Sequence, residues 1–149
     1  MKKNQLLTCL LFIFSFLFSE GCTDPQDLIA PTHFTRVPPV LHLQGALGFV
    51  PSGKRQILLT WEYDTLNANI RTWDVTRSIN DTASGAFVPL EIVRKSASGY
   101  PFYSDTSGVI QSQNIGTDSL DIFYKVIPNG MDNFVGQPSD VVHIIVRRF

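Results

Sequence analysis

The sequence predicts an all-β fold, a sandwich of about seven short strands. Stretches rich in β-branched and aromatic residues recur from about residue 40 onward, and Gly, Pro, Asn, Asp and Ser separate them. In two of these stretches, apolar and polar residues alternate around a tryptophan, as in a strand with one buried face. No stretch after the N-terminal segment has the periodicity of an amphipathic helix. These patterns together predict two packed antiparallel sheets.

The alternation is clearest around the two tryptophans. Ile57, Leu59 and Trp61 occupy one face of a predicted strand, and Trp73 and Val75 occupy one face of the next. The expected strands, in chain order, are 40–47, 56–63, 70–78, 86–94, 100–105, 120–128 and 140–149. The expected core comprises Leu59, Trp61, Trp73, Val75, Leu90, Ile92, Ile122, Tyr124, Val126, Val142 and Ile144.

The first 21 residues have the pattern of an export signal. Two lysines near the start precede an almost entirely apolar run over 6–18, and small residues follow this run. The run is shorter than the roughly 20 apolar residues that span a bilayer. The expected organisation is therefore a signal peptide at 1–21, a proline-rich tether at 22–39 and a folded domain at 40–149.

Gly21-Cys22, directly after the apolar run, resembles the lipobox of bacterial lipoproteins. In that family the cysteine thiol receives a diacylglyceryl group, and the signal is then cut before the cysteine. The new amino terminus is usually acylated as well, for example with palmitate. Ser19 and Glu20 stand where the family usually has Leu and then Ala or Ser. The resemblance implies lipid attachment at Cys22. In some lipoproteins an Asp directly after the cysteine retains the protein at the inner membrane. Thr23 occupies this position here, which implies the outer membrane. The alternative is an ordinary secretory signal with Cys22 as an incidental thiol.

Charge and cysteine content exclude several classes of protein. The removed segment carries Lys2, Lys3 and Glu20, so the remaining 128 residues have a net charge of −2 rather than −1. A nearly neutral chain without a basic stripe is not expected to bind nucleic acid, because phosphate contacts need clustered Lys and Arg. The second cysteine, Cys9, lies in the signal, so we expect no internal disulfide in the mature chain.

The order and spacing of the predicted strands resemble a fibronectin type III domain over residues 31–146. Trp61 matches the core tryptophan of the family's second strand. The third strand commonly reads aromatic-x-Val-x-Arg, and this pattern is matched by Trp73, Val75 and Arg77. The resemblance implies a seven-stranded immunoglobulin-like sandwich.

The C-terminal part of the chain carries two further points of resemblance. Tyr124 stands two residues before Val126, as in the tyrosine corner of the family. The stretch GQPSD at 136–140 matches the Gly-x-x-Ser turn that commonly precedes the last strand. The Arg-Gly-Asp tripeptide by which some members bind integrins is absent, so that activity is not implied.

The sequence contains no GxSxG, Walker or HExxH motif. His33, His42 and His143 lack the spacing of metal ligands and are expected to face solvent from the tether or from strands. Aspartates near predicted loops are expected to form turns rather than a Ca²⁺ site; these are Asp64, Asp81, Asp105, Asp118 and Asp132. We therefore expect no enzyme activity, no cofactor and no metal site.

Aromatic and apolar residues in two predicted loops are the candidate contact residues. The stretch SGYPFYSD supplies Tyr100 and Tyr103, and NGMDNFVGQ supplies Met131 and Phe134. Such side chains stack on sugars or anchor protein partners when they are exposed on loops. In the alternative interpretation Phe102 belongs to the core and the two tyrosines only border it.

Three tripeptides resemble the Asp-Ser/Thr-aliphatic acceptor of a bacterial O-glycosylation system. They place candidate attachment sites at Thr65, Thr82 and Ser119, all in expected loops. The alternative is that these residues only form turns.

These patterns together suggest a lipid-anchored, non-catalytic interaction module of the bacterial cell envelope, an accessory subunit of a larger complex. Its expected partners are the membrane, through the lipid, and a protein of the envelope. The alternative function is a glycan-binding surface lipoprotein that uses loop aromatics. An enzyme ranks behind both.

Overall fold

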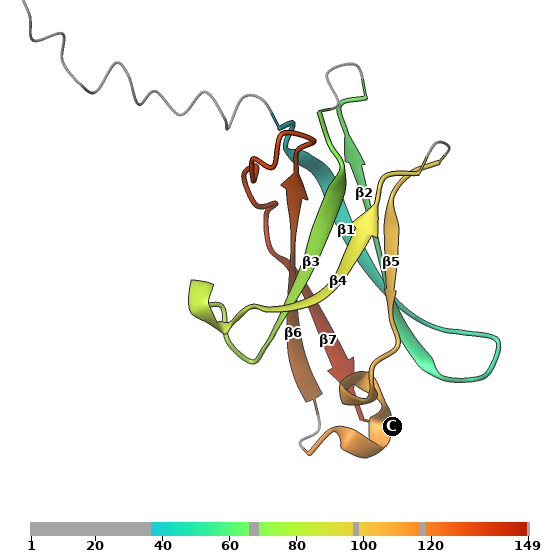
Figure 1. The fold of residues 1–149 in the computed structure, drawn as a ribbon. Helices are drawn as coiled ribbons and strands as arrows, with labels where there is room; N and C mark the ends of the chain where they lie inside the picture. The colour runs from blue at the N-terminus through green and yellow to red at the C-terminus, as the bar shows by residue number, and fades with distance from the viewer. Residues whose placement is uncertain (1–36, 66–68, 97–98, 117–118, 149) are drawn as a thin grey trace, which may run out of the picture. The chain divides into compact units, whose positions relative to one another are not determined.

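Two antiparallel sheets stack face to face in a computed structural model that describes residues 37–65, 69–96, 99–116 and 119–148 (Figure 1). The predicted all-β sandwich is confirmed. The strands are β1 (Val40–Phe49), β2 (Arg55–Tyr63), β3 (Thr72–Ile79), β4 (Val88–Arg94), β5 (Phe102–Asp105), β6 (Ser119–Asn129) and β7 (Val142–Arg147).

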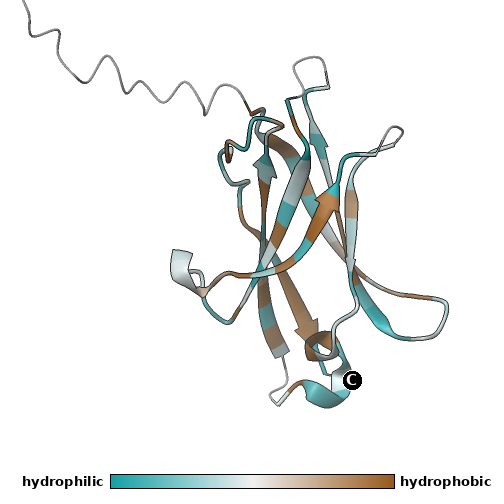
Figure 2. Cartoon of the chain, in the orientation of Figure 1, coloured by the Kyte–Doolittle hydropathy of each residue, from teal (hydrophilic) through white to brown (hydrophobic). Residues whose placement is uncertain are grey.

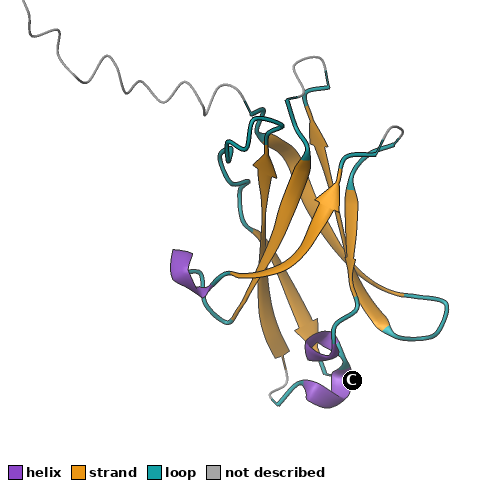
Figure 3. Ribbon diagram, in the orientation of Figure 1, coloured by secondary structure: helices purple, strands orange, loops and turns teal. Residues whose placement is uncertain are grey.

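The strands divide into a three-stranded sheet, in the order β1-β2-β5, and a four-stranded sheet, in the order β4-β3-β6-β7. Helical structure in the described part of the chain is limited to single 3₁₀ turns in connections (Figure 3). These turns are η2 (Ser84–Ala86), η3 (Gly108–Ile110) and η4 (Ser112–Asn114).

The core lies between the sheets, as the alternation of hydrophobic and hydrophilic residues along the strands requires (Figure 2). Trp61 of β2 and Trp73 of β3 are buried, and their rings meet edge to face across the two sheets with centroids 5.9 Å apart. Edge-to-face contact is a favoured geometry for aromatic pairs. The further members of the core are Val37, Val40, Ile57, Leu59, Ile70, Val75, Ile110, Ile115, Ile122, Tyr124, Val126 and Val146.

Ile92 is not a core residue, and this corrects the sequence prediction. Its side chain is 60% exposed. Val75 pairs with Glu91 but Thr76 pairs with Pro89, so β4 contains one extra residue at this point. The bulge shifts the inward-facing positions of β4, so that Leu90 and Val93 pack against the core while Ile92 faces outward.

The folded domain begins before residue 40, which corrects the expected end of the tether. Val37 is fully buried, and Pro38 is also buried. Val37 packs against two glycines of the β6–β7 connection: a Cβ added to Gly130 or to Gly136 would lie 2.9 Å from a methyl group of Val37. The start of the domain is therefore held against this connection.

β1 is longer than expected and contains a bulge. Leu41 pairs with Glu62 whereas Gln44 pairs with Thr60, so β1 has one extra residue between these pairs. His42 adopts a positive φ of 49° in this bulge. Further along, β1 runs so close to β7 that a Cβ on Gly45 would lie 3.0 Å from Ile144 Cδ1.

A buried polar cluster joins the two sheets at the end where the chain terminates. Arg77 Nη1 of β3 donates to Asp105 Oδ2 of β5 and to Ser107 Oγ, each at 2.6 Å. The hydroxyl of Tyr124, in β6, donates to the same Asp105 Oδ2 at 2.7 Å, and the Ser107 N–H donates to Oδ1 at 2.9 Å. Asp105 is 1% exposed and Arg77 is 7% exposed, so water screens this ion pair little.

The cluster shifts two ionisation equilibria. Burial by itself would raise the pKa of Asp105, but the hydrogen bonds from Ser107 and Tyr124 and the charge of Arg77 together hold this pKa below its ordinary value. Burial raises the pKa of the Tyr124 hydroxyl, and the adjacent Asp105 carboxylate raises it further. The native fold therefore favours a charged Asp105 and a neutral Tyr124.

Candidate functional site

Three connections gather at the end of the sandwich where β1 begins, and we call this the loop end (Figure 1). They are the β2–β3 connection, described at 64–65 and 69–71, the β4–β5 connection, described at 95–96 and 99–101, and the β6–β7 connection at 130–141. Antiparallel pairing brings them together, because Val40 pairs with Tyr63, and Thr72 pairs with Asn129.

The β6–β7 connection opens with a tight turn. The N–H of Gly130 donates to the carbonyl of Phe134 at 2.8 Å, and the N–H of Asn133 donates back to the carbonyl of Gly130 at 3.2 Å. Asn133 has a φ of 64°, a left-handed conformation that Asn adopts more readily than most residues. Asp132 Oδ1 accepts from the N–H of Phe134 at 3.3 Å, an Asx turn that further fixes the backbone.

Asn69 of the β2–β3 connection ties this turn to the neighbouring loop. Its Nδ2 donates to Asp132 Oδ2 at 2.9 Å, and its Oδ1 accepts from the backbone N–H of Met131 at 3.2 Å. Met131 itself is 63% exposed. An exposed apolar side chain is thus presented on a backbone that two loops hold in place.

The predicted contact residues fall into two groups. Tyr100, Met131 and Phe134 are exposed, by 75%, 63% and 38% respectively. Tyr103 is partly buried against the core, and this burial, together with the charge of Asp105, raises its pKa. Phe102 is 63% exposed, so the alternative that placed it in the core is wrong: it pairs with Thr60, whose side chain also faces outward.

Tyr100 stands beside two small hollows in the surface. One, of about 290 Å³, is lined by His42, Gln44, Thr60, Trp61, Glu62 and Tyr100. The other, of about 270 Å³, is lined by Tyr63, Thr65, Gly99 and Tyr100. Tyr100 therefore presents an exposed ring next to space that a small polar ligand can enter.

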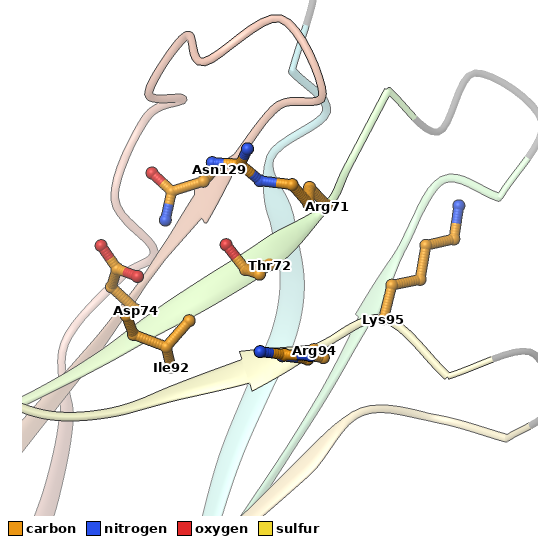
Figure 4. A pocket seen from close by; sticks show the side chains of 7 residues that line it. All are labelled: Arg71, Thr72, Asp74, Ile92, Arg94, Lys95 and Asn129. Carbon is orange, nitrogen blue, oxygen red and sulfur yellow. The ribbon is translucent and has the colours of Figure 1, made fainter.

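A larger hollow of about 630 Å³ lies on the outer face of the four-stranded sheet, and we call it the basic hollow (Figure 4). It is lined by Arg71, Thr72, Asp74, Ile92, Arg94, Lys95 and Asn129. Strand pairing creates it, because Thr72 at the start of β3 pairs with Arg94 on one side and with Asn129 on the other. No local pattern in the sequence predicts this site, because its residues come together only through strand pairing.

The basic hollow continues toward the loop end. Arg71 and Lys95 also line a neighbouring hollow of about 380 Å³, together with Ile70, Ser96 and Met131. The Lys95 ammonium lies 5.5 Å from the ring centroid of Tyr63, which in turn packs edge to face on Trp73 at 5.0 Å. The two hollows therefore form one surface, which extends from Arg94 past Arg71 and Lys95 to Met131.

The candidate glycosylation sites occupy different kinds of position. Thr65 and Thr82 are exposed in the β2–β3 and β3–β4 connections. Ser119 is also exposed, but it begins β6 and pairs with Arg147, so its expected place in a loop is wrong. Strand pairing extends one residue beyond the apolar stretch that marked this strand in the sequence.

The histidines within the described ranges face solvent and pair with carboxylates. His42 Nδ1 lies 3.0 Å from Glu62 Oε2, and His143 Nε2 lies 2.6 Å from Asp121 Oδ1. Across residues 37–148, apart from the three gaps, no three His, Cys, Asp or Glu side chains gather as a metal site would require.

The N-terminal predictions fall outside the described residues. These are the signal peptide at 1–21, the lipid attachment at Cys22 and the solvent-facing position of His33. Within the part that the structure describes, no helix is both long enough and apolar enough to cross a membrane. Neither a protein-family model nor a curated protein matches the chain.

Proposed function

We propose that this protein is a membrane-anchored, non-catalytic interaction module of the bacterial cell envelope, and that it serves as an accessory lipoprotein subunit of a larger complex. The anchor is a lipid on Cys22, located at the outer membrane, and the folded part is a fibronectin type III-like sandwich. The observation that carries the proposal is the exposed Met131 on a turn that Asn69 holds in place. Preorganised apolar anchors of this kind reduce the entropic cost of binding a partner.

Several features support the assignment to the fibronectin type III family. Trp61 and Trp73 meet in the core at the strands that the resemblance specifies. The Tyr124 hydroxyl bonds back to the carboxylate of Asp105 at the end of β5, 19 residues upstream, whereas a tyrosine corner bonds to a backbone group only a few residues upstream. The two sheets contain three and four strands, and the total of seven is the number of strands expected for the family. Because one such fold serves many roles, the function rests on the loop end and not on the family.

The proposal can be tested by crosslinking in membranes, followed by purification of the tagged, acylated protein. We expect the unaltered protein to capture a stoichiometric protein partner. Met131→Ala should weaken this capture, whereas Val88→Ala should not, because Val88 is a similarly exposed apolar residue, at 53%, in a strand that begins away from the loop end. Cys22→Ala should release the protein from the membrane fraction. Membrane-bound protein without any partner would contradict the proposal.

A glycan-binding function is the second candidate, favoured by the exposed ring of Tyr100 beside two hollows. Aromatic rings supply the flat apolar face on which sugars stack. The intrinsic fluorescence of the protein can be titrated with envelope and dietary polysaccharides. A saturable change that Tyr100→Ala abolishes would favour this function over protein binding, and the absence of any change would exclude it for the polysaccharides used.

A further inference from the structure

We propose that the basic hollow is the docking site for an acidic peptide segment of the partner protein, and that Arg71 and Arg94 pair with its Asp or Glu carboxylates. The inference rests on the function proposed above and specifies the chemistry of the partner.

Charge complementarity is the first argument. The described residues of the lining include three cationic side chains, Arg71, Arg94 and Lys95, and one carboxylate, that of Asp74. The chain as a whole carries a net charge of −1, so this local excess of positive charge is not a consequence of a basic composition. A positive patch on a nearly neutral protein steers an acidic partner to this place.

Two of the cations have no partner for their guanidinium groups among the described residues. Both arginines are exposed, and neither guanidinium takes part in any hydrogen bond or ion pair that involves the described residues. A guanidinium presents paired donors that match the geometry of a carboxylate. Figure 4 shows Arg71 and Arg94 on opposite sides of the Thr72 hydroxyl, and Asn129 adds an amide to the same hollow. The site can therefore receive two carboxylates or one carboxylate with its flanking peptide groups.

The nature of the lining favours a peptide over a sugar or a nucleic acid. Among the described residues that line the hollow there is no aromatic ring on which a sugar could stack. The lining contains Ile92 instead, which is 60% exposed and suits an aliphatic side chain of the ligand. Nucleic acid requires a longer row of cations that follows successive phosphates, whereas the described lining gathers its cations around a single hollow.

The peptide should cross the face of the sheet and not extend its edge. β4 is the outermost strand of the four-stranded sheet. The backbone N–H of Ile92 donates to Glu91 Oε1 at 3.2 Å, so the carboxylate of Glu91 lies on the β4 backbone. This carboxylate would repel an acidic strand that paired with β4. A path over Arg94 and Arg71 leads instead to the neighbouring hollow and to Met131.

The probe for a first test is fluorescein-labelled hexaglutamate, titrated against the full acylated protein in detergent, with hexaglutamine and polygalacturonate as comparisons. We expect a saturable rise in anisotropy with hexaglutamate only. Arg71→Gln combined with Arg94→Gln should weaken binding by about tenfold or more. The matched control is Arg147→Gln, which removes an exposed arginine from the far end of β7. Circular dichroism verifies that each variant is folded.

Three results of this titration would overturn the inference: no saturable binding of hexaglutamate, equal weakening by Arg147→Gln, or binding of polygalacturonate in preference to the peptide. Crosslinking with the double variant separates this inference from the proposed function. If the double variant captures the partner as well as the unaltered protein does, the basic hollow is not the docking site, although the proposed function stands. If the unaltered protein captures no partner, the proposed function itself fails.

Discussion

Asp105→Asn should destabilise the domain far more than the loss of a surface charge does. The substitution keeps the shape of the side chain but removes the charge that compensates Arg77, which is 7% exposed. An arginine cannot lose its proton in a protein, so a buried and uncompensated charge remains. Breaking a buried ion pair in this way costs about 3–5 kcal/mol. A domain of this size has about 5–15 kcal/mol of stability in total, so a large fraction of it should be lost.

The assay is unfolding in urea at neutral pH, followed by the fluorescence of the buried tryptophans Trp61 and Trp73. Asp121→Asn is the control, because the Asp121–His143 pair is about half exposed and should contribute only about 0–1 kcal/mol. Replacing both members of the buried pair, with Arg77→Met and Asp105→Leu, should cost less than Asp105→Asn alone, since no charge then stays buried. The reasoning is refuted if Asp105→Asn costs no more than Asp121→Asn, or if the double variant is the least stable.

Three further expectations follow from contacts described above. Folding lowers the pKa of Asp105, so the stability that Asp105 contributes should be present above its unfolded-state pKa and should be lost as the pH falls below about 4. Folding raises the pKa of Tyr124, so stability should also fall as the pH rises above about 10. Unfolding curves measured across this pH range test both expectations. Gly136→Val should destabilise the domain by about 1–3 kcal/mol in urea unfolding, because a Cβ at this position would lie 2.8 Å from Pro128 Cγ, whereas Gly85→Ala, which has open space, should cost little. Asn69→Ala removes two hydrogen bonds to the β6–β7 turn and should accelerate hydrogen exchange at the Met131 amide, while Asn114→Ala, which removes a bond at the other end of the sandwich, should not.

The elements that could be predicted are those whose signal is local. The alternation around Trp61 and Trp73 identifies β2 and β3 and the buried faces of both, because one buried face imposes a period of two on any strand. The outward turn of Ile92 could not be predicted in this way. It depends on a bulge, and a bulge is a property of the pairing between two strands that an alternating pattern in one strand does not reveal.

The same distinction explains the result at the candidate site. Tyr100 and Met131 were found because turn residues surround a large apolar side chain, and their exposure agrees with that prediction. Arg71 and Arg94 were missed because they are far apart in the sequence and meet only through the register of the β3–β4 hairpin. A signal did exist, since one arginine directly precedes β3 and the other ends β4. These positions indicate a common site only when the register between β3 and β4 is known, and turn and bulge geometry determine that register.

The packing of Val37 against Gly130 and Gly136 fixes the end of the sandwich at which the chain enters the fold. The chain enters the fold at the loop end, whereas the last described residue, Arg148, follows β7 at the opposite end (Figure 1). If Cys22 carries the lipid, the 15 residues that follow it up to Val37 can reach at most about 50 Å when fully extended. A partner that binds at Met131 would then be confined to a thin layer above the bilayer. A fluorescent protein fused beyond Arg148 would extend from the end of the sandwich opposite to the loop end and leave the loop end open.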